Sequence, residues 1–191
     1  MSLIPAFEIG VWNAWIFSVP FLIVTYGLSY LIVDRKASLF AWPLYTKLEK
    51  RFVPIQMLLM LVPCIYSIFL PLKMGVAWFY AGLIIYLLGL AFIIMAVITF
   101  SATPLDKPNT TGIYRVSRNP MYFGWFLAYV GIGIASTSWL FLLLSVALII
   151  VMTILAVPEE RFFCEKYGDA YREYMNRTPR WIGIPKIVKS K

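Results

Sequence analysis

The sequence predicts an all-α integral membrane protein with five transmembrane helices. Its 191 residues are 61% hydrophobic and 14% charged, and the mean hydropathy is +0.80. A soluble domain has about a quarter of its residues charged. This chain lacks the polar residues needed to cover a surface in water, so we expect lipid to be its solvent. The apolar residues fall into four long blocks, and the basic residues cluster between the blocks. These two patterns together predict the number of crossings.

The first three blocks are each long enough for one membrane-spanning helix. Residues 11–33 would form a helix of about 35 Å at 1.5 Å per residue, against a hydrocarbon core of about 30 Å. The second block, 52–72, contains three prolines, and the third is 74–100. The glycines of the third block recur at every seventh position: Gly75, Gly82 and Gly89. This spacing predicts a face of small residues on which a neighbouring helix packs closely.

The fourth block, 121–157, is too long for a single crossing. As one helix it would measure about 55 Å, nearly twice the thickness of the hydrocarbon core. The stretch "ASTS" at 135–138 interrupts the block, and two glycines precede it. We therefore predict a helical hairpin in which the fourth and fifth spans are short.

The positions of the basic residues indicate which side of the membrane each connection faces. Of the 17 lysines and arginines, all except Lys73 lie in three segments, 34–51, 101–120 and the tail after Pro158. With five spans these three segments share one side, and the positive-inside rule makes that side cytoplasmic. We expect the N-terminus outside and the C-terminus in the cytoplasm. Basic residues beside anionic lipid account for the net charge of +8, so we expect no nucleic-acid partner.

The residues that the sequence lacks exclude several kinds of site. It has no histidine and only two cysteines, Cys64 and Cys164. Neither a metal centre nor a Ser-His or Cys-His catalytic pair is therefore expected. No apolar block carries Asp, Glu, Lys or Arg in its interior, which argues against an ion pathway. The site of an enzyme would have to use the polar residues at the cytoplasmic surface.

The first cluster of such residues is "TTGIYRVSRNPMYFG", 110–124, immediately before the fourth span. Asn119 is a good N-cap residue and Pro120 a good first-turn residue, so a helix is expected to begin here. The free N–H groups of a helix N-terminus bind carboxylates and phosphates. Gly124, one turn further, leaves room for a ligand to approach the backbone.

The second cluster is "VPEERFFCEKYGDAYREYMNRTPRW", 157–181, after the fifth span. Pro158 is expected to kink a helix or to begin a new one. Aromatic residues then recur at helical spacing and predict an amphipathic cytoplasmic helix that lies in the headgroup layer: Phe163, Tyr167, Tyr171 and Tyr174. Glu159 and Glu160 gain nothing from anionic lipid, so we expect them to meet a cationic partner.

In this order, the two clusters resemble the isoprenylcysteine carboxyl methyltransferase family of integral membrane enzymes, which is related to the phospholipid N-methyltransferases. The resemblance covers about 101–183 and consists of G-x-Y-x-x-x-R-(H or N)-P-x-Y-x-G, a Glu pair, and Y-G-x-x-Y-x-x-Y. It implies that 1–100 supply three spans and that 101–191 form a methyltransferase region that binds S-adenosylmethionine.

The resemblance also implies which residues contact the cofactor: Asn109, Tyr114, Asn119, Pro120, Met121, Tyr122, Glu159 and Glu160. Glu159 would face the cofactor, with Glu160 as its neighbour. A helix N-terminus suits the carboxylate of the cofactor, and acids suit its ribose hydroxyls or amino group. Two positions depart from the family pattern. Asn119 stands where a histidine is common, and Leu155 stands where eukaryotic relatives have an arginine linked to the substrate.

The implied function is methylation of the C-terminal carboxylate of an isoprenylated cysteine, or of a similar lipid-borne carboxylate. Such a carboxylate is already deprotonated at neutral pH, so no general base is needed. Catalysis would come from alignment of the reactants and exclusion of water, with the lipid tail entering from the bilayer. Arg118 and Arg161 are the candidate partners of the acceptor carboxylate. Two alternatives stay open, N-methylation of a phospholipid amine and a non-enzymatic membrane scaffold or small transporter.

Overall fold

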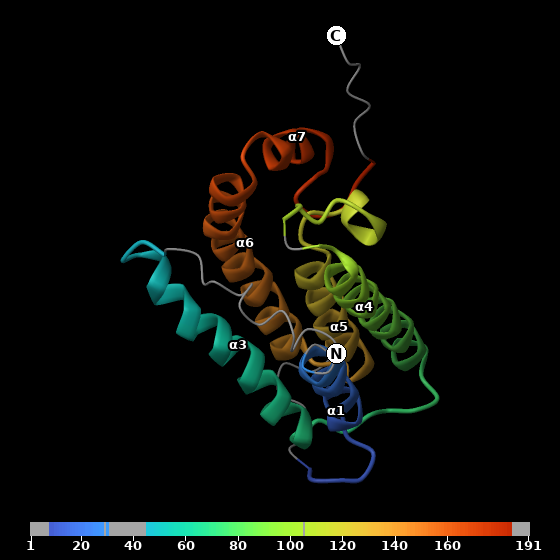
Figure 1. The fold of residues 1–191 in the computed structure, drawn as a ribbon. Coiled ribbons are helices and arrows are strands. Elements are labelled where there is room, and N and C mark those ends of the chain that lie inside the picture. Colours follow the sequence, from blue (N-terminus) through green and yellow to red (C-terminus); the bar gives the residue numbers. More distant parts are fainter. Residues whose placement is uncertain (1–7, 29, 31–44, 105, 185–191) are drawn as a thin grey trace.

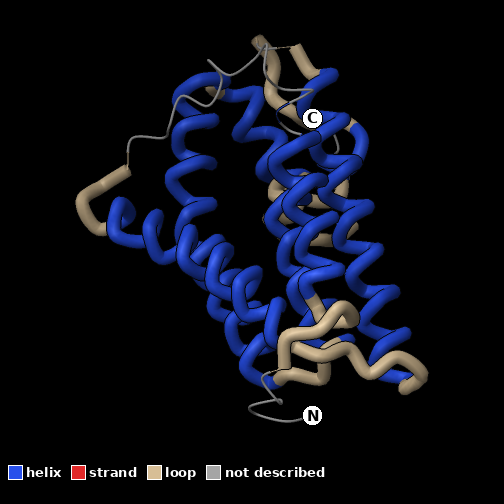
Figure 2. The backbone as a smooth tube through the Cα atoms, turned by 90° about the horizontal axis from the view of Figure 1, so that it is seen from below, coloured by secondary structure: helices blue, strands red, loops and turns tan. Residues whose placement is uncertain are grey.

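The computed structural model describes residues 8–28, 30, 45–104 and 106–184, and this part of the chain is helical (Figure 1). Its only pairing of extended backbone is an isolated bridge between Asn13 and Pro71. The elements in chain order are α1 (Trp15–Leu22), η1 (Ile23–Leu28), η3 (Glu49–Arg51), α3 (Phe52–Tyr66), η4 (Ser67–Phe69), α4 (Ala77–Ala102), η5 (Gly112–Arg115), α5 (Pro120–Ala135), α6 (Trp139–Tyr167) and α7 (Asp169–Arg177). The prediction of an all-α protein is confirmed, and Figure 2 shows how helices make up most of the described chain.

Among the described residues, three helical segments are long and apolar enough to cross a membrane: Glu49–Phe69, Ala77–Ala102 and Trp139–Tyr167. Two shorter apolar segments, Trp15–Leu28 and Pro120–Ala135, accompany them. Large apolar side chains are exposed along the outer faces of these helices, as expected where lipid is the solvent. The protein is therefore an integral membrane protein. Five crossings remain a prediction from the charge distribution, and part of the first predicted span, 29 and 31–33, lies outside the described residues.

Small residues let α4 and α5 approach closely, and this pair makes the most extensive contact between helices. A Cβ atom on Gly82 would lie 2.5 Å from the carbonyl oxygen of Gly131, and one on Gly89 would lie 2.5 Å from the amide nitrogen of Ala128. The prediction of a small-residue face is confirmed for these two glycines. It is wrong for Gly75, which precedes α4 with a φ of +96° and faces open space.

Residues 136–138 separate α5 from α6, at the interruption that the sequence predicts. The Ser138 hydroxyl accepts a hydrogen bond from the Phe141 backbone N–H at 3.2 Å and caps α6. Pro158 does not begin a new helix, because α6 continues through it for nine more residues to Tyr167. The apolar part of α6 ends at Val157, and the last turns of the helix contain charged residues.

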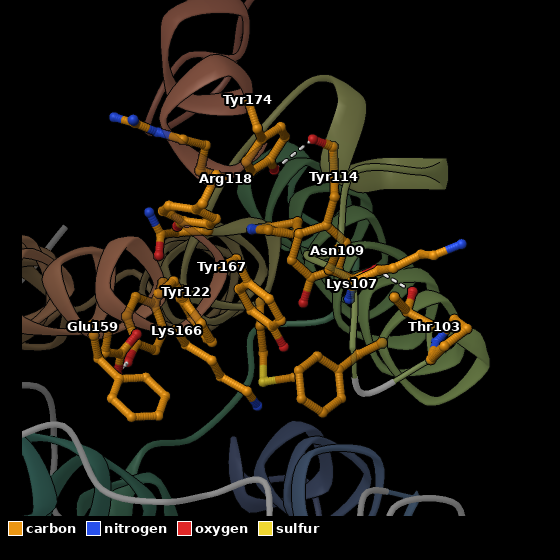
Figure 3. Close-up of a pocket in the computed structure, with 18 of the residues that line it drawn as sticks. Thr103, Lys107, Asn109, Tyr114, Arg118, Tyr122, Glu159, Lys166, Tyr167 and Tyr174 are labelled. Carbon is orange, nitrogen blue, oxygen red and sulfur yellow. Dashed lines mark hydrogen bonds between the residues drawn. The ribbon is translucent and has the colours of Figure 1, made fainter. Parts of the chain in front are cut away.

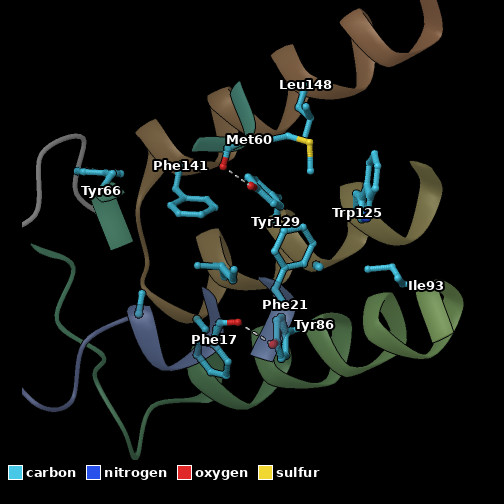
Figure 4. Packing of buried hydrophobic residues seen from close by; sticks show 14 of the residues in the cluster. Phe17, Phe21, Met60, Tyr66, Tyr86, Ile93, Trp125, Tyr129, Phe141 and Leu148 are labelled. Carbon is cyan, nitrogen blue, oxygen red and sulfur yellow. Dashed lines mark hydrogen bonds between the residues drawn. The ribbon is translucent and has the colours of Figure 1, made fainter. Parts of the chain in front are cut away.

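Buried aromatic side chains connect the helices at the centre of the bundle (Figure 4). The Tyr86 hydroxyl donates to the Phe17 carbonyl at 2.7 Å, and the Tyr129 hydroxyl donates to the Met60 carbonyl at 2.6 Å. The first bond joins α4 to α1, and the second joins α5 to α3. Because water is absent from the interior of a membrane, buried hydroxyls need such partners. These contacts hold α5 in place, and with it the polar residues at its N-terminal end.

Polar elements that are distant in sequence meet at one end of the bundle. In Figure 1, η5, the start of α5 and α7 lie at that end, whereas the connection from α3 to α4 lies at the opposite end. The two polar clusters of the sequence are therefore neighbours in space.

Candidate functional site

A cavity of about 290 Å³ lies at this polar end, between the start of α5 and the last turns of α6 (Figure 3). Four further parts of the chain contribute side chains to it: the residue Tyr45, the end of α4, the loop after α4, and α7. The lining residues are Tyr45, Phe100, Thr103, Pro104, Lys107, Asn109, Tyr114, Arg118, Asn119, Pro120, Met121, Tyr122, Trp125, Glu159, Phe162, Phe163, Lys166, Tyr167, Tyr171 and Tyr174.

The expected helix start is present, but Asn119 does not cap it with its side chain. Pro120 is the first residue of α5 and Asn119 occupies the N-cap position. The Asn119 side-chain amide instead donates to the carbonyl of Arg180 at 3.3 Å. The predicted start of the helix is confirmed, and the side-chain amide of Asn119 binds the C-terminal part of the chain.

That C-terminal part binds the whole stretch 114–119, which we call the motif turn. The Arg118 N–H donates to the Pro179 carbonyl at 3.0 Å, and the Gly183 N–H donates to the Val116 carbonyl at 3.0 Å. The Tyr174 hydroxyl donates to the Tyr114 carbonyl at 2.7 Å. The shape of the cavity at the motif turn thus depends on residues some 60 positions further along the chain.

Glu160 is buried, with 5% of its surface exposed, and lies between two arginines. Its carboxylate pairs with Arg118 at 3.2 Å and with Arg180 at 2.7 Å. The hydrogen bonds that Arg180 donates to Glu160 raise the pKa of Arg180 above its usual range. A buried carboxylate needs such partners. Through these two ion pairs Glu160 joins the motif turn to the C-terminal segment. Glu160 is not among the residues that line the cavity.

Glu159 does line the cavity, although it is the immediate neighbour of Glu160. It follows the apolar part of α6 and accepts a hydrogen bond from the Tyr122 hydroxyl. Burial raises the pKa of the Glu159 carboxyl well above its ordinary value; the Tyr122 bond opposes this shift, and the charge of Glu160 adds to it. The charged form of a carboxyl group in this position would be stabilised by a nearby cation or by hydrogen bonds from further hydroxyl groups.

The four aromatic residues of the second cluster form a wall of the cavity. They do not share one helix, because Gly168 has a φ of +59° and separates α6 from α7. The rings of Phe163 and Tyr167 stack at 6.0 Å, and Phe163 meets Tyr171 at 5.4 Å. Tyr171 and Tyr174 are buried, so the prediction that this stripe lies in the headgroup layer is wrong. The exposed face of α7 is polar, with Arg172 among its residues.

Three nitrogen atoms of lining side chains are buried and have no hydrogen-bond partner within the described residues. They are Asn109 Nδ2, Arg118 Nε and Trp125 Nε1. Buried polar atoms in proteins almost always have partners, so each exception needs an explanation. A polar molecule bound in the cavity would supply the missing acceptors.

The structure brings most of the residues proposed from the sequence into this cavity. Asn109, Tyr114, Arg118, Asn119, Pro120, Met121, Tyr122 and Glu159 all line it. Glu160 and Arg161 do not. Arg161 forms an ion pair with Glu49 at 3.0 Å outside the cavity.

Other lining residues were not singled out from the sequence. Tyr45, Thr103 and Lys107 come from parts of the chain whose position depends on packing. Trp125 and Lys166 carried a usable signal. Trp125 is four residues after Met121, and Lys166 is seven after Glu159, so each shares a helix face with a proposed residue.

Comparison with known proteins identifies similar chains. A model of the phospholipid methyltransferase family matches residues 72–170, which include the whole of α4, α5 and α6. The protein-S-isoprenylcysteine O-methyltransferase of Dictyostelium discoideum is 30% identical over 89 residues. This similarity covers 41% of the present chain and 32% of the Dictyostelium protein, so the chain spans about a third of the length of that relative.

Proposed function

Because the chain belongs to the phospholipid methyltransferase family, we propose that it transfers the methyl group of S-adenosylmethionine to a carboxylate borne by a lipid-tailed acceptor, such as an isoprenylated cysteine. Membership of the family confirms the resemblance in the two polar clusters and supports the activity of a membrane methyltransferase. The observation that carries the proposal is the cavity between the motif turn and Glu159, which contains buried donors without partners.

The residues of the cavity fit S-adenosylmethionine, which supplies a methyl group on a positively charged sulfur. Glu159 would accept hydrogen bonds from its ribose hydroxyls or its amino group. The unpartnered amide nitrogen of Asn109 and the N-terminal end of α5 would bind its acceptor atoms and its carboxylate. The aromatic wall, which includes Phe163 and Tyr167, suits both a flat base and a cation over the ring faces.

A carboxylate acceptor matches the chemistry of the lining side chains. It needs no general base, since it is deprotonated at neutral pH. Burial raises the pKa of Tyr114 and Tyr174 above their usual range, so these hydroxyls stay protonated and do not serve as general bases. The residues align the reactants and exclude water, which can lower the barrier by about 7–11 kcal/mol when the alignment is good.

The cations of the cavity also favour a carboxylate. Arg118, Lys107 and Lys166 line it, against the single acid Glu159. Of the two arginines considered from the sequence, Arg118 reaches the cavity and has an unpartnered Nε, so we assign it as the partner of the acceptor carboxylate. The N-methyltransferase alternative requires a proton acceptor, and Glu159 is the lining acid that has this capacity.

We further propose that the chain crosses the membrane five times with its C-terminus in the cytoplasm. The basic segments then all face the cytoplasm, and so does the polar end that holds the cavity. The cofactor would enter from the cytoplasm and the lipid tail from the bilayer.

The test uses purified protein, methyl-labelled S-adenosylmethionine and two acceptors, a farnesylated cysteine analogue and an aminophospholipid. Methyl esters release volatile methanol in base, whereas N-methyl groups do not. We expect base-labile label on the farnesylated cysteine. Label that remains on the aminophospholipid after base, with none on the cysteine, would select the alternative. Absence of S-adenosylhomocysteine binding and of transfer to either acceptor would favour a scaffold or transporter.

A further inference from the structure

We infer that Trp125 selects an oxygen acceptor, because its indole N–H donates to the carboxylate oxygen that does not attack the methyl group. This inference rests on the proposed function and names a residue that determines specificity within it. It starts from an unpartnered donor that neither the two sequence motifs nor the cofactor assignment uses.

Trp125 lies in the second turn of α5 with 9% of its surface exposed, and it lines the cavity (Figure 4). Its ring centre lies 5.4 Å from that of Tyr122, whose hydroxyl binds Glu159. Its Nε1 is buried and has no partner among the described residues. An indole nitrogen is a donor only, so no rotation or protonation change can turn it into an acceptor.

Trp125 lies deeper in the bundle than the polar residues of the motif turn, although both line the same cavity. Since α5 begins at Pro120, Trp125 lies about 7 Å further along the helix axis, toward the apolar part of the bundle. Side chains of a helix lean toward its N-terminus, so the indole extends back toward the cavity. Met121, one turn earlier, presents an apolar side chain on the same face. This side of the cavity suits the polar group of a lipid-tailed acceptor.

The chemistry of the transfer leaves an oxygen for this donor. One carboxylate oxygen forms the new O–C bond while the S–C bond breaks, and the bonding electron pair stays on sulfur. No proton moves. The second oxygen keeps its lone pairs and accepts the Trp125 N–H. An ammonium or amine would present its own N–H groups to the indole, which would leave two buried donors facing each other.

The test compares the wild type with Trp125→Phe, which keeps an aromatic ring and removes the N–H. We expect kcat/KM for the farnesylated cysteine analogue to fall by about tenfold or more, on the scale of one lost buried hydrogen bond. The Kd for S-adenosylhomocysteine should stay within about twofold, because the donor serves the acceptor. Trp78→Phe, a change at an exposed tryptophan of α4, is the matched control and should leave both values unchanged.

Either of two results would overturn this inference and leave the proposed function intact. One is unchanged kcat/KM in Trp125→Phe; the other is an equal loss of S-adenosylhomocysteine affinity, which would give the N–H to the cofactor. If Trp125→Phe does not fold, benzothienylalanine at position 125 replaces the N–H by sulfur in the same ring shape, with the same expected result. A wild type that methylates only the aminophospholipid overturns the proposed function, and this inference with it.

Discussion

The guanidinium of Arg180 binds both oxygens of the Glu160 carboxylate, with Nη2 at 2.7 Å from Oε2 and Nε at 3.1 Å from Oε1. Arg118 of the motif turn approaches the same carboxylate at 3.2 Å. One buried acid therefore joins the start of α5, the end of α6 and the C-terminal segment. The cavity lies directly beside this junction, since Glu159 and Arg118 both line it.

Arg180→Ala should destabilise the protein and weaken cofactor binding together. Glu160 would lose one of its two cationic partners while remaining buried, at a cost of about 1–3 kcal/mol. The motif turn would also lose an anchor, so the affinity for S-adenosylhomocysteine should fall. Thermal unfolding in detergent and titration calorimetry measure both effects. Arg177→Ala removes an exposed pair with Glu173 and should change neither. Equal behaviour of the two variants would show that the junction does not support the cavity.

Glu159→Gln should weaken binding of S-adenosylhomocysteine by about 1–3 kcal/mol, or roughly 5- to 150-fold in Kd, because it removes the only acid that lines the described cavity. The amide keeps the size of the side chain, so expression and folding should be unaffected. Glu165→Gln changes an exposed acid of the same helix and serves as the control. Unchanged Kd in Glu159→Gln would mean that Glu159 does not contact the cofactor.

The raised pKa of Glu159 predicts opposite pH trends for binding and for stability. The charged form binds a cationic ligand, so affinity for S-adenosylmethionine should increase as pH rises through this pKa. The folded state holds the proton more tightly than the unfolded state, so the stabilising contribution of this group is lost over the same rise. Calorimetry and unfolding of the ligand-free protein between pH 5 and 8.5 measure the two trends. Both pH trends should be much weaker in Glu159→Gln. If the variant shows the same trends as the wild type, a group other than Glu159 causes them.

Gly82→Val should prevent α4 from packing against α5. Even its first added carbon would lie 2.3 Å from the backbone nitrogen of Ala135, where neither backbone can yield. Because the motif turn leads directly into α5, the unfolding temperature should fall strongly, and S-adenosylhomocysteine binding should be lost or strongly reduced. Ala81→Val, at the adjacent exposed position of α4, should be tolerated. Wild-type stability in Gly82→Val would contradict the close approach of the two helices.

Cysteine labelling in intact cells tests the five-crossing topology. In a variant without Cys64 and Cys164, a cysteine that replaces Lys73 should react with an impermeant reagent from outside. Cysteines that replace Asp106 or Arg172 should react only after permeabilisation, since both belong to the polar end that holds the cavity. Labelling of position 172 from outside would show that the orientation is the reverse of the predicted one, or that the number of crossings is wrong.

Local patterns were enough to predict much of the architecture. The break at 136–138, the helix start at Pro120 and the close contact at Gly82 and Gly89 follow from residue types and spacings over one or two turns. The distribution of basic residues predicted that the two polar clusters lie on the same side of the membrane. The family pattern assigned both Tyr122 and Glu159 to the cofactor site, and the structure joins the two by a hydrogen bond.

The role of each glutamate was decided only by the tertiary structure. Glu159 and Glu160 are adjacent in the sequence, but successive residues of a helix point about 100° apart. One therefore faces the cavity and the other faces Arg118 and Arg180. Which one does so depends on how α6 is rotated against α5, and the packing of the whole bundle sets that rotation. For the same reason the contributions of Tyr45 and Arg180 were not singled out from the sequence. Their neighbours lie tens of residues away, and no local spacing encodes the contact.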